Sequence, residues 1–337
     1  DLEALDAWIE DLMEDWTTPG LAGGIVHGDS LVFARGYGVR TLGSEESVDE
    51  HTRIAVASNS KAFTAAALGM LVEEEILGWD DRVIDQLPDF QMWDPWVTRD
   101  IRVRDLLTHR SGLATFGGDH LWIGATNGRE EIISRVRFME PVGPFRASFH
   151  YQNLMFLVAG QVGHAASGLS WDEIIATRIF SPLGMSESST SVRDLVGLEN
   201  VASAHEVVQG ELRPVDYDNV DGVAPAVAIN SNVVDMARFI QSSLTRGELD
   251  GVRILPEPYY AQMWTAYNET PFGGFELGSL YPTELFAEDG MGWFVSEVAG
   301  TPVFAAYGGE RGYQTTLILA PDAGIGIIAT GNGLGGG

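Results

Sequence analysis

A serine and a lysine three residues apart are the first place where this sequence could do chemistry. Lys61 is the single lysine among the 20 Lys and Arg residues of the chain. Ser58 precedes it at the start of a helix-like stretch, so the two side chains share one helix face. A desolvated lysine can release its proton, whereas arginine cannot. The pair predicts a hydroxyl nucleophile beside an amine base. A surface helix with an N-cap serine and a solvated lysine would have the same sequence pattern.

The composition excludes several classes of protein. The formal net charge is −28, with 48 acidic residues, which disfavours binding to nucleic acid or anionic membranes. There is no cysteine, so disulfides, thiol nucleophiles and zinc–thiolate sites are excluded. Hydrophobic residues make up 45% of the 337 residues, enough for a large core. No apolar run reaches the ~18 residues of a membrane span. Strong acidity with a single lysine is consistent with a high-salt habitat. A GC-rich genome, which would replace lysine with arginine, explains the low lysine content as well.

The apolar periodicity divides the chain into helix-like and strand-like segments. Apolar spacing predicts an amphipathic helix over 2–16. A glycine turn at 28–30 predicts a hairpin between strands 22–27 and 31–37. A capping box at 170–173 opens a helix, and Asn232 is expected to cap another. Further helices are predicted at 104–112, 151–166 and 233–244, an irregular acidic region at 186–230, and strands at 291–298, 302–307, 314–320 and 325–331.

Strand-like segments at both chain ends enclose a helix-rich middle. This order predicts an α+β fold of the sandwich type, with one antiparallel sheet formed by both termini and flanked by helices. Residues 1–57 and 232–337 are expected to form the sheet domain, and 58–231 a mainly helical lobe. A cleft between the two is the natural position for a site.

Two further groups could act with Ser58. Tyr151 and Asn153 open an apolar run, where a phenol can pass a proton and an amide can orient a lysine and a substrate amide. A core tyrosine at a helix start fits the same residues. Residues 307–310 read Tyr-Gly-Gly-Glu in a predicted strand. The two glycines would let a substrate backbone pair with the strand edge. A β-bulge would explain the two glycines equally well.

Taken in this order, Ser-x-x-Lys, Tyr-x-Asn and the aromatic-x-Gly strand resemble the serine β-lactamase and penicillin-binding-protein superfamily. The most similar branch contains class C β-lactamases, D-aminopeptidases and carboxylesterase-like proteins. The resemblance implies a β-lactamase/transpeptidase-like fold and a serine hydrolase that acts through an acyl-enzyme. Its substrates would be amides or esters, such as D-amino-acid peptides or peptidoglycan-like compounds. Connecting segments that carry the resemblance lie at 53–64, 101–113, 179–185, 235–239 and 308–314.

The resemblance also implies a role for individual residues. Ser58 would be the acylated nucleophile and Lys61 the base that activates it. Tyr151 would relay protons to the leaving group and from the deacylating water. Asn153 would orient Lys61 and the acyl amide. The backbone N–H groups of Ser58 and Glu310 would form the oxyanion hole. Neither a metal nor a cofactor is expected.

The third motif departs from the family pattern. Relatives usually have Lys or His where Tyr307 stands, so this strand, with Gly309 beside it, offers no positive charge to a substrate carboxylate. Arg311 is a speculative replacement for that cation. The departure counts against an efficient β-lactamase. Relatives commonly continue with a further helix after the last strand, so we expect a chain that is truncated or completed differently.

Other site types have weaker support in the sequence. The Gly-x-Ser-x-Gly elbow and His-Glu-x-x-His are both missing. His150 beside Tyr151 is interpreted as a structural histidine rather than a triad member. Residues 216–222 faintly resemble a calcium loop, but Val220 occupies a ligand position. Two alternatives stay open: a carboxylesterase that also binds β-lactams, and a non-catalytic penicillin-binding-like module.

The expected partner is a small-molecule or peptide substrate, with no nucleic acid and no membrane span. The resemblance favours an exported protein, periplasmic or extracellular, whose signal is absent from this chain. A cytoplasmic location stays open, and the sequence makes no prediction of oligomeric state.

Overall fold

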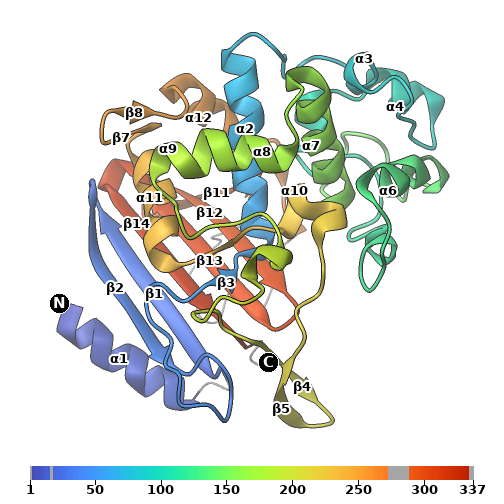
Figure 1. The fold of residues 1–337 in the computed structure, drawn as a ribbon. Coiled ribbons are helices and arrows are strands. Elements are labelled where there is room, and N and C mark those ends of the chain that lie inside the picture. Colours follow the sequence, from blue (N-terminus) through green and yellow to red (C-terminus); the bar gives the residue numbers. More distant parts are fainter. Residues whose placement is uncertain (1, 16–17, 272–287, 334–337) are drawn as a thin grey trace.

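An antiparallel sheet with eight strands among the described residues forms the centre of the molecule (Figure 1). The computed structural model describes residues 2–15, 18–271 and 288–333. The strand order is β2-β1-β14-β13-β12-β11-β10-β9. The main strands are β1 (Gly20–His27), β2 (Ser30–Gly38), β11 (Phe294–Val298), β12 (Thr301–Glu310), β13 (Tyr313–Ala320) and β14 (Ile325–Gly331), with β9 (Asn268–Glu269) and β10 (Glu288–Asp289) at one edge.

The two chain ends pair with each other within this sheet. β1 pairs antiparallel with β14, from Leu21 opposite Gly331 to His27 opposite Ile325. Strand β13 alternates buried and partly exposed residues along its length, as expected for a strand with two different faces. The predicted sheet of both termini, and with it the α+β fold class, is confirmed.

Helix α11 (Val233–Leu244) covers one face of the sheet where β1 and β14 join (Figure 1). Its side chains approach closely because two strand positions are glycine. A Cβ on Gly24 would lie 2.5 Å from a Val233 methyl carbon, and one on Gly326 would lie 2.2 Å from Ile240. Asn232 caps the helix, as predicted, by accepting a hydrogen bond from the Asp235 N–H at 2.9 Å. On the sheet's outer side, α1 (Leu2–Asp15) contacts β2.

Helix α2 (Ser60–Glu73) is the core of the helical part of the molecule. It is buried all round from Ser60 to Leu71, with little amphipathic character, and packs against α7 (Asn153–Ser167), α8 (Trp171–Ile175) and α10 (Ala224–Val227). The other helices are α3 (Val83–Gln86), α4 (Pro95–Asp100), α5 (Val103–Leu106), α6 (Arg129–Arg135), α9 (Ser181–Leu183) and α12 (Glu257–Met263).

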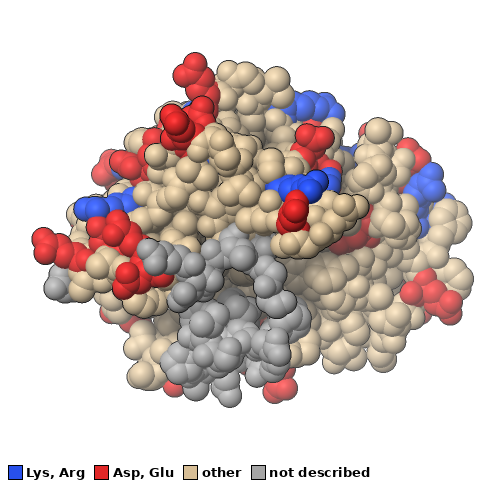
Figure 2. Space-filling model, turned by 90° about the horizontal axis from the view of Figure 1, so that it is seen from below, with Lys and Arg blue, Asp and Glu red and all other residues tan. Residues whose placement is uncertain are grey.

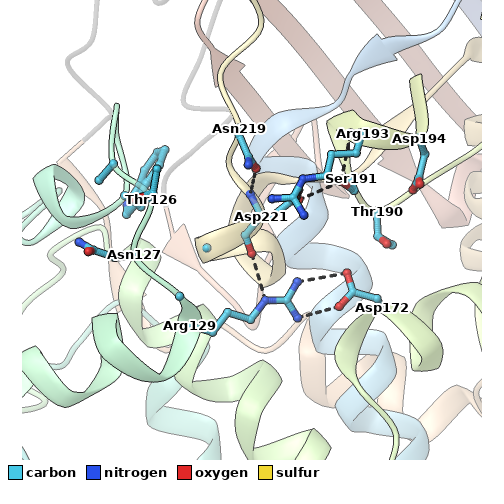
Figure 3. A pocket seen from close by; sticks show the side chains of 14 residues that line it. Thr126, Asn127, Arg129, Asp172, Thr190, Ser191, Arg193, Asp194, Asn219 and Asp221 are labelled. Atoms are coloured by element: carbon cyan, nitrogen blue, oxygen red, sulfur yellow. Dashed lines mark hydrogen bonds and ion pairs between the residues drawn. The ribbon is translucent and has the colours of Figure 1, made fainter. Parts of the chain in front are cut away.

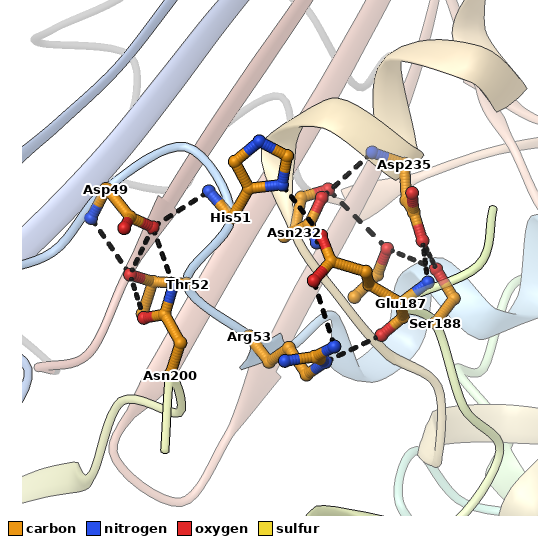
Figure 4. A network of polar contacts seen from close by, with 10 residues as sticks. Asp49, His51, Thr52, Arg53, Glu187, Ser188, Asn200, Asn232 and Asp235 are labelled. Carbon is orange, nitrogen blue, oxygen red and sulfur yellow. Dashed lines mark hydrogen bonds and ion pairs between the residues drawn. The ribbon is translucent and has the colours of Figure 1, made fainter. Parts of the chain in front are cut away.

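A polar network holds three distant segments together (Figure 4). The Glu187 carboxylate accepts from His51 Nδ1 at 2.7 Å, Arg53 Nη2 at 3.0 Å and Asn232 Nδ2 at 2.9 Å. Asp235, at the start of α11, accepts from the Glu187 N–H at 2.8 Å. These bonds fix the segment before β3 (Ile54–Ala55), which leads directly to Ser58.

Two predictions about local structure are wrong. The helix predicted at 104–112 ends at Leu106, because buried Asp105 is held by Arg146 and Arg110, and His109 adopts a left-handed φ of 48°. The irregular region at 186–230 contains a hairpin of β4 (Ala204–Val208) and β5 (Glu211–Val215).

Short strand pairs complete the fold. Strand β3 pairs with β6 (Asn230–Ser231), and β7 (Glu248–Leu249) pairs with β8 (Val252–Arg253). The β3–β6 pair lies beside both predicted domain boundaries, 57/58 and 231/232, and the two-domain division itself stays a prediction.

The surface carries many acidic side chains. On the face seen in Figure 2 they are spread over several places, with fewer basic ones. Among the helices of the described ranges, none combines the length and the apolar character that a membrane span requires.

Candidate active site

Ser58 lies in a tight turn between the sheet and the central helix. The chain leaves β3, passes through one 3₁₀ turn, η1 (Ala57–Asn59), and enters α2. Ala57 has a left-handed φ of 49°, a strained conformation for a non-glycine residue. The Asn59 side chain donates to Val56 O at 2.7 Å and to Thr315 O on β13 at 3.0 Å. The turn is therefore fixed to the sheet, and Ser58 is held at the N-terminal end of the helix.

The Lys61 amine lies beside the Ser58 hydroxyl. Lys61 is 2% exposed, and its Nζ is 3.0 Å from Ser58 Oγ, 2.8 Å from Asn153 Oδ1 and 3.0 Å from Ala226 O. An amide oxygen and a backbone carbonyl can only accept hydrogen bonds. A neutral amine has two N–H groups for these acceptors and one lone pair, which then faces the Ser58 O–H. This arrangement suits a general base.

Burial supports the neutral form of this amine. Loss of hydration lowers the pKa of Lys61 to about 7, against the opposing effect of the Asp119 and Glu310 carboxylates, which raise it. A base with a pKa near neutrality can take a proton and return it within one reaction cycle.

Asp119 fixes the orientation of Asn153, and sequence reasoning missed it. Its Oδ2 accepts from Asn153 Nδ2 at 2.8 Å and its Oδ1 from Trp122 Nε1 at 3.1 Å. Because a carboxylate accepts from the amide nitrogen, the amide oxygen must face Lys61. Asp119 lies in the pattern-poor stretch that precedes Tyr151, and no local motif distinguishes it from the chain's many surface acids.

The phenol of Tyr151 also reaches Ser58. The two side chains are hydrogen-bonded, and burial raises the Tyr151 pKa above its ordinary value of 10.0. Lys61 Nζ lies 4.7 Å from the centre of the Tyr151 ring. His109 stacks on the same ring at 4.3 Å, while its Nδ1 accepts from the Gln152 N–H at 3.0 Å. Since burial lowers the His109 pKa well below its usual range, a neutral imidazole supports the phenol.

Strand β12 runs along the nucleophile turn. A Cβ on Gly308 would lie 2.2 Å from Val56 O and 2.9 Å from Ser58 N, so only glycine fits this approach. Gly309 is exposed, and Tyr307 and Glu310 are half-buried. The Glu310 carboxylate accepts from the Arg311 N–H at 3.1 Å. The second oxyanion donor, the Glu310 N–H, stays a prediction.

The speculative role of Arg311 does not agree with its contacts. Its guanidinium is held by two carboxylates, Glu206 at 3.1 Å and Asp218 at 3.2 Å. The positive charge is therefore neutralised by the β4–β5 hairpin and the segment that follows it. We do not assign Arg311 to a substrate carboxylate.

The described residues contain no group of three or more His, Asp or Glu side chains arranged to hold a metal ion.

Comparison with known proteins identifies the family to which the chain belongs. The β-lactamase family matches residues 5–337. Unguisins hydrolase ungD' of Aspergillus campestris is 28% identical over 96% of this chain and 60% of its own length. A D-aminopeptidase of Cereibacter sphaeroides is 29% identical over 55% of this chain and 36% of its own. The chain thus spans 60% and 36% of the lengths of these two relatives.

A solved structure gives the same answer at the level of the fold. The octameric penicillin-binding protein homologue from Pyrococcus abyssi superposes with a TM-score of 0.86 at 25% identity, over 99% of this chain and 74% of that one. With Ser58, Lys61, Tyr151 and Asn153 gathered at one point of a shared fold, the chain belongs to the β-lactamase family.

Proposed function

We propose that this chain is a serine hydrolase that cleaves amide or ester bonds through an acyl-enzyme on Ser58. The observation that carries the proposal is the position of the buried Lys61 amine, 3.0 Å from the Ser58 hydroxyl. Its two other hydrogen-bond partners, Asn153 Oδ1 and Ala226 O, are acceptors. D-Amino-acid peptides or amides, or peptidoglycan-like compounds, are the proposed substrates. Support for amide substrates comes from the relative named D-aminopeptidase.

Acylation begins with proton transfer from Ser58 Oγ to Lys61 Nζ. The oxygen attacks the substrate carbonyl, and the resulting oxyanion accepts hydrogen bonds from the N–H groups of Ser58 and Glu310. The Lys61 proton passes through the Tyr151 hydroxyl to the leaving nitrogen or oxygen as the carbonyl carbon releases it. A neutral amine or alcohol departs, and Lys61 is neutral again.

Deacylation repeats these steps with water. A water molecule gives its proton to the Tyr151–Lys61 pair as its oxygen attacks the ester carbonyl. The tetrahedral intermediate then expels Ser58 Oγ, which takes the proton back. Asn153, held by Asp119, keeps the amine aligned in both halves of the reaction.

The substrate side of the site favours neutral groups over carboxylates. Tyr307 replaces the usual cation, and Arg311 is neutralised by Glu206 and Asp218. Phe116, whose side chain is 57% exposed, has its ring centre 5.3 Å from that of Tyr151 and offers apolar contact to an acyl group. These features favour amides without a carboxylate, and a carboxylesterase is the second candidate. Comparing D-alanine amides with short-chain p-nitrophenyl esters distinguishes the two.

A fluorophosphonate should label Ser58 once. Because the Lys61 amine lies 3.0 Å from the Ser58 hydroxyl, we expect a single adduct in the intact mass of the wild type and none in Ser58→Ala. Peptide mapping assigns the position. Ser60→Ala is the comparison, since the Ser60 hydroxyl already donates to Ala57 O at 2.7 Å and accepts from the Ile229 N–H at 3.0 Å. An unlabelled wild type would favour the non-catalytic module.

The pH dependence of hydrolysis should follow the Lys61 amine. Since only the neutral amine is a base, kcat/KM should rise with pH through about 7, the pKa of Lys61. Asp119→Asn removes a carboxylate that raises this pKa, so the rise should move to lower pH. Asp29→Asn, the same charge change at the β1–β2 turn, is the control. If kcat/KM rises at the same pH in Asp119→Asn as in the wild type, the pH dependence does not come from the Lys61 amine.

A further inference from the structure

Three backbone hydrogen bonds hold the chain at Tyr151, and His109 forms two of them. The His150 N–H donates to the His109 carbonyl oxygen at 2.7 Å, and the Gln152 N–H donates to His109 Nδ1 at 3.0 Å. In the third bond, the Tyr151 carbonyl oxygen accepts from the Phe116 N–H at 2.9 Å. The residues before and after the phenol are therefore both fixed by His109.

The imidazole of His109 also contacts the phenol itself. It stacks on the Tyr151 ring with 4.3 Å between the ring centres and an angle of 26° between the planes. The rings of Phe149 and Phe156 pack around it, each with its centre at 5.3 Å, and His109 is 2% exposed. A closely packed side chain keeps one orientation, so the imidazole fixes the plane of the phenol. We call these three contacts of His109 the histidine clamp.

The backbone around His109 is held in turn. Its φ of 48° lies in the left-handed region, in which histidine and asparagine are enriched over most residues. On one side, the Thr108 carbonyl oxygen accepts from Asn268 Nδ2 at 2.6 Å. On the other side, the Arg110 carbonyl oxygen accepts from the Arg146 N–H at 2.8 Å. The clamp is thus part of a rigid segment rather than of a free loop.

The bond to Gln152 also decides where the imidazole carries its proton. A backbone N–H can only donate, so Nδ1 must accept, and the proton of the neutral ring lies on Nε2. A proton on Nδ1 would place two N–H groups against each other. The role of His109 is therefore separate from the proton transfers assigned to Lys61 and Tyr151.

The proposed relay depends on the position of the Tyr151 hydroxyl. This group is hydrogen-bonded to Ser58 and must also reach the leaving atom of the substrate. It gives its proton to that atom as the bond to the carbonyl carbon breaks, and it takes up the proton that Lys61 received from Ser58. A displacement of about 1 Å at such a group can cost ~10² in rate.

We propose that His109 is a positioning residue for the Tyr151 proton relay, acting through the two backbone N–H groups that flank Tyr151 and through the stack on its ring. This inference rests on the proposed function, since it concerns the same reaction. A leaving group that departs readily as an anion needs little proton donation, whereas a strongly basic one needs it fully. The loss caused by a misplaced phenol therefore grows with the basicity of the leaving group.

The clamp is separate from the cavity shown in Figure 3. That cavity, of about 620 Å³, is lined by residues within 122–129, 190–194 and 219–222 and by Asp172. Arg129 joins its walls by pairing with Asp172 at 2.7 and 3.1 Å and by donating to Asp221 O at 3.0 Å. Neither His109 nor Tyr151 lines it, so we expect substitutions at position 109 to leave this cavity unchanged.

The test compares esters that share one acyl group and differ in the leaving group. For His109→Ala, kcat/KM should fall by ~10² with ethyl acetate, as expected for a displaced general acid, with phenyl acetate in between. With p-nitrophenyl acetate, whose leaving group is a stable anion, it should fall by less than about tenfold. His109→Asn should recover part of the loss, because its Oδ1 can accept from the Gln152 N–H and asparagine tolerates the left-handed backbone.

His205→Asn is the matched control, at a second buried histidine. His205 is 0% exposed, its Nε2 accepts from the Leu42 N–H at 2.9 Å, and its Nδ1 donates to Asn332 O at 2.7 Å. A loss of stability in this variant should lower the three rates in the same proportion. An equal loss on all three esters in both His109 variants would overturn the positioning role.

Nitrogen NMR of the protein with isotope-labelled histidine tests the clamp without turnover. The His109 signals, assigned by their loss from the spectrum of His109→Asn, should show a neutral ring with its proton on Nε2 at neutral pH. A proton on Nδ1 would overturn the proposal even where a variant is too unstable to assay. Either negative result leaves the hydrolase standing if the wild type cleaves the esters and Ser58 is labelled. A wild type that does neither would contradict the proposed function and the relay with it.

Discussion

Replacing Lys61 with arginine should reduce kcat/KM for p-nitrophenyl acetate by about 10²- to 10⁴-fold, the range by which a general base accelerates such reactions. Arginine keeps a positive charge and long side chain but cannot give up its proton. The wild-type amine is buried and its pKa is lowered to about 7, so it can be neutral at the pH of the assay. Initial rates on the purified variant, with circular dichroism to verify folding, measure the effect.

The composition of the chain allows a rescue experiment as the control. Because the sequence has no cysteine, Lys61→Cys carries a single thiol. Aminoethylation of that thiol in the unfolded protein, followed by refolding, restores an amine at nearly the original position. Activity should return in part, while treatment with iodoacetamide, which adds a neutral amide instead, should not restore it. An arginine variant as active as the wild type would refute the amine mechanism.

Gly308→Ala should lower activity by about 100-fold, although the residue has no side chain to contribute. A Cβ there would lie 2.2 Å from Val56 O, 2.7 Å from Asn59 Nδ2 and 2.9 Å from Ser58 N. The strand or the nucleophile turn must move, and a displacement of about 1 Å at a reacting group can cost ~10² in rate. Overpacking should also lower the free energy of unfolding by ~1–3 kcal/mol. Ester hydrolysis and urea denaturation measure the two effects.

Gly309→Ala is the matched comparison for this prediction. The nearest atom to a Cβ at that position is a Tyr307 ring carbon at 3.9 Å, so the same methyl group meets no clash. Its effect on stability should be much smaller than that of Gly308→Ala. If the two variants lose stability and activity equally, the loss reflects strand composition rather than contact with the Ser58 turn.

The residues proposed to perform the chemistry could be predicted from the sequence because each carries its own signal. Lys61 is the single lysine, three residues after Ser58. Asn153 begins a helix that the apolar pattern predicts, and Tyr151 lies two residues before it. The strands also follow from local pattern, since alternation and glycine turns are properties of neighbouring residues. Antiparallel pairing of the two chain ends follows from their order along the chain.

Tertiary structure alone decided how these residues are held and charged. Asp119 lies 34 residues before Asn153 in the chain, yet its carboxylate orients that amide. Ala226 contributes only a backbone carbonyl, which carries no sequence signal, and Arg311 is neutralised by Glu206 and Asp218 from a hairpin region that was expected to be irregular. The pKa of Lys61 depends on burial by α7 and α10. Solvent exclusion and long-range contacts are properties of the packed chain, whereas residue type and spacing are present in the sequence itself.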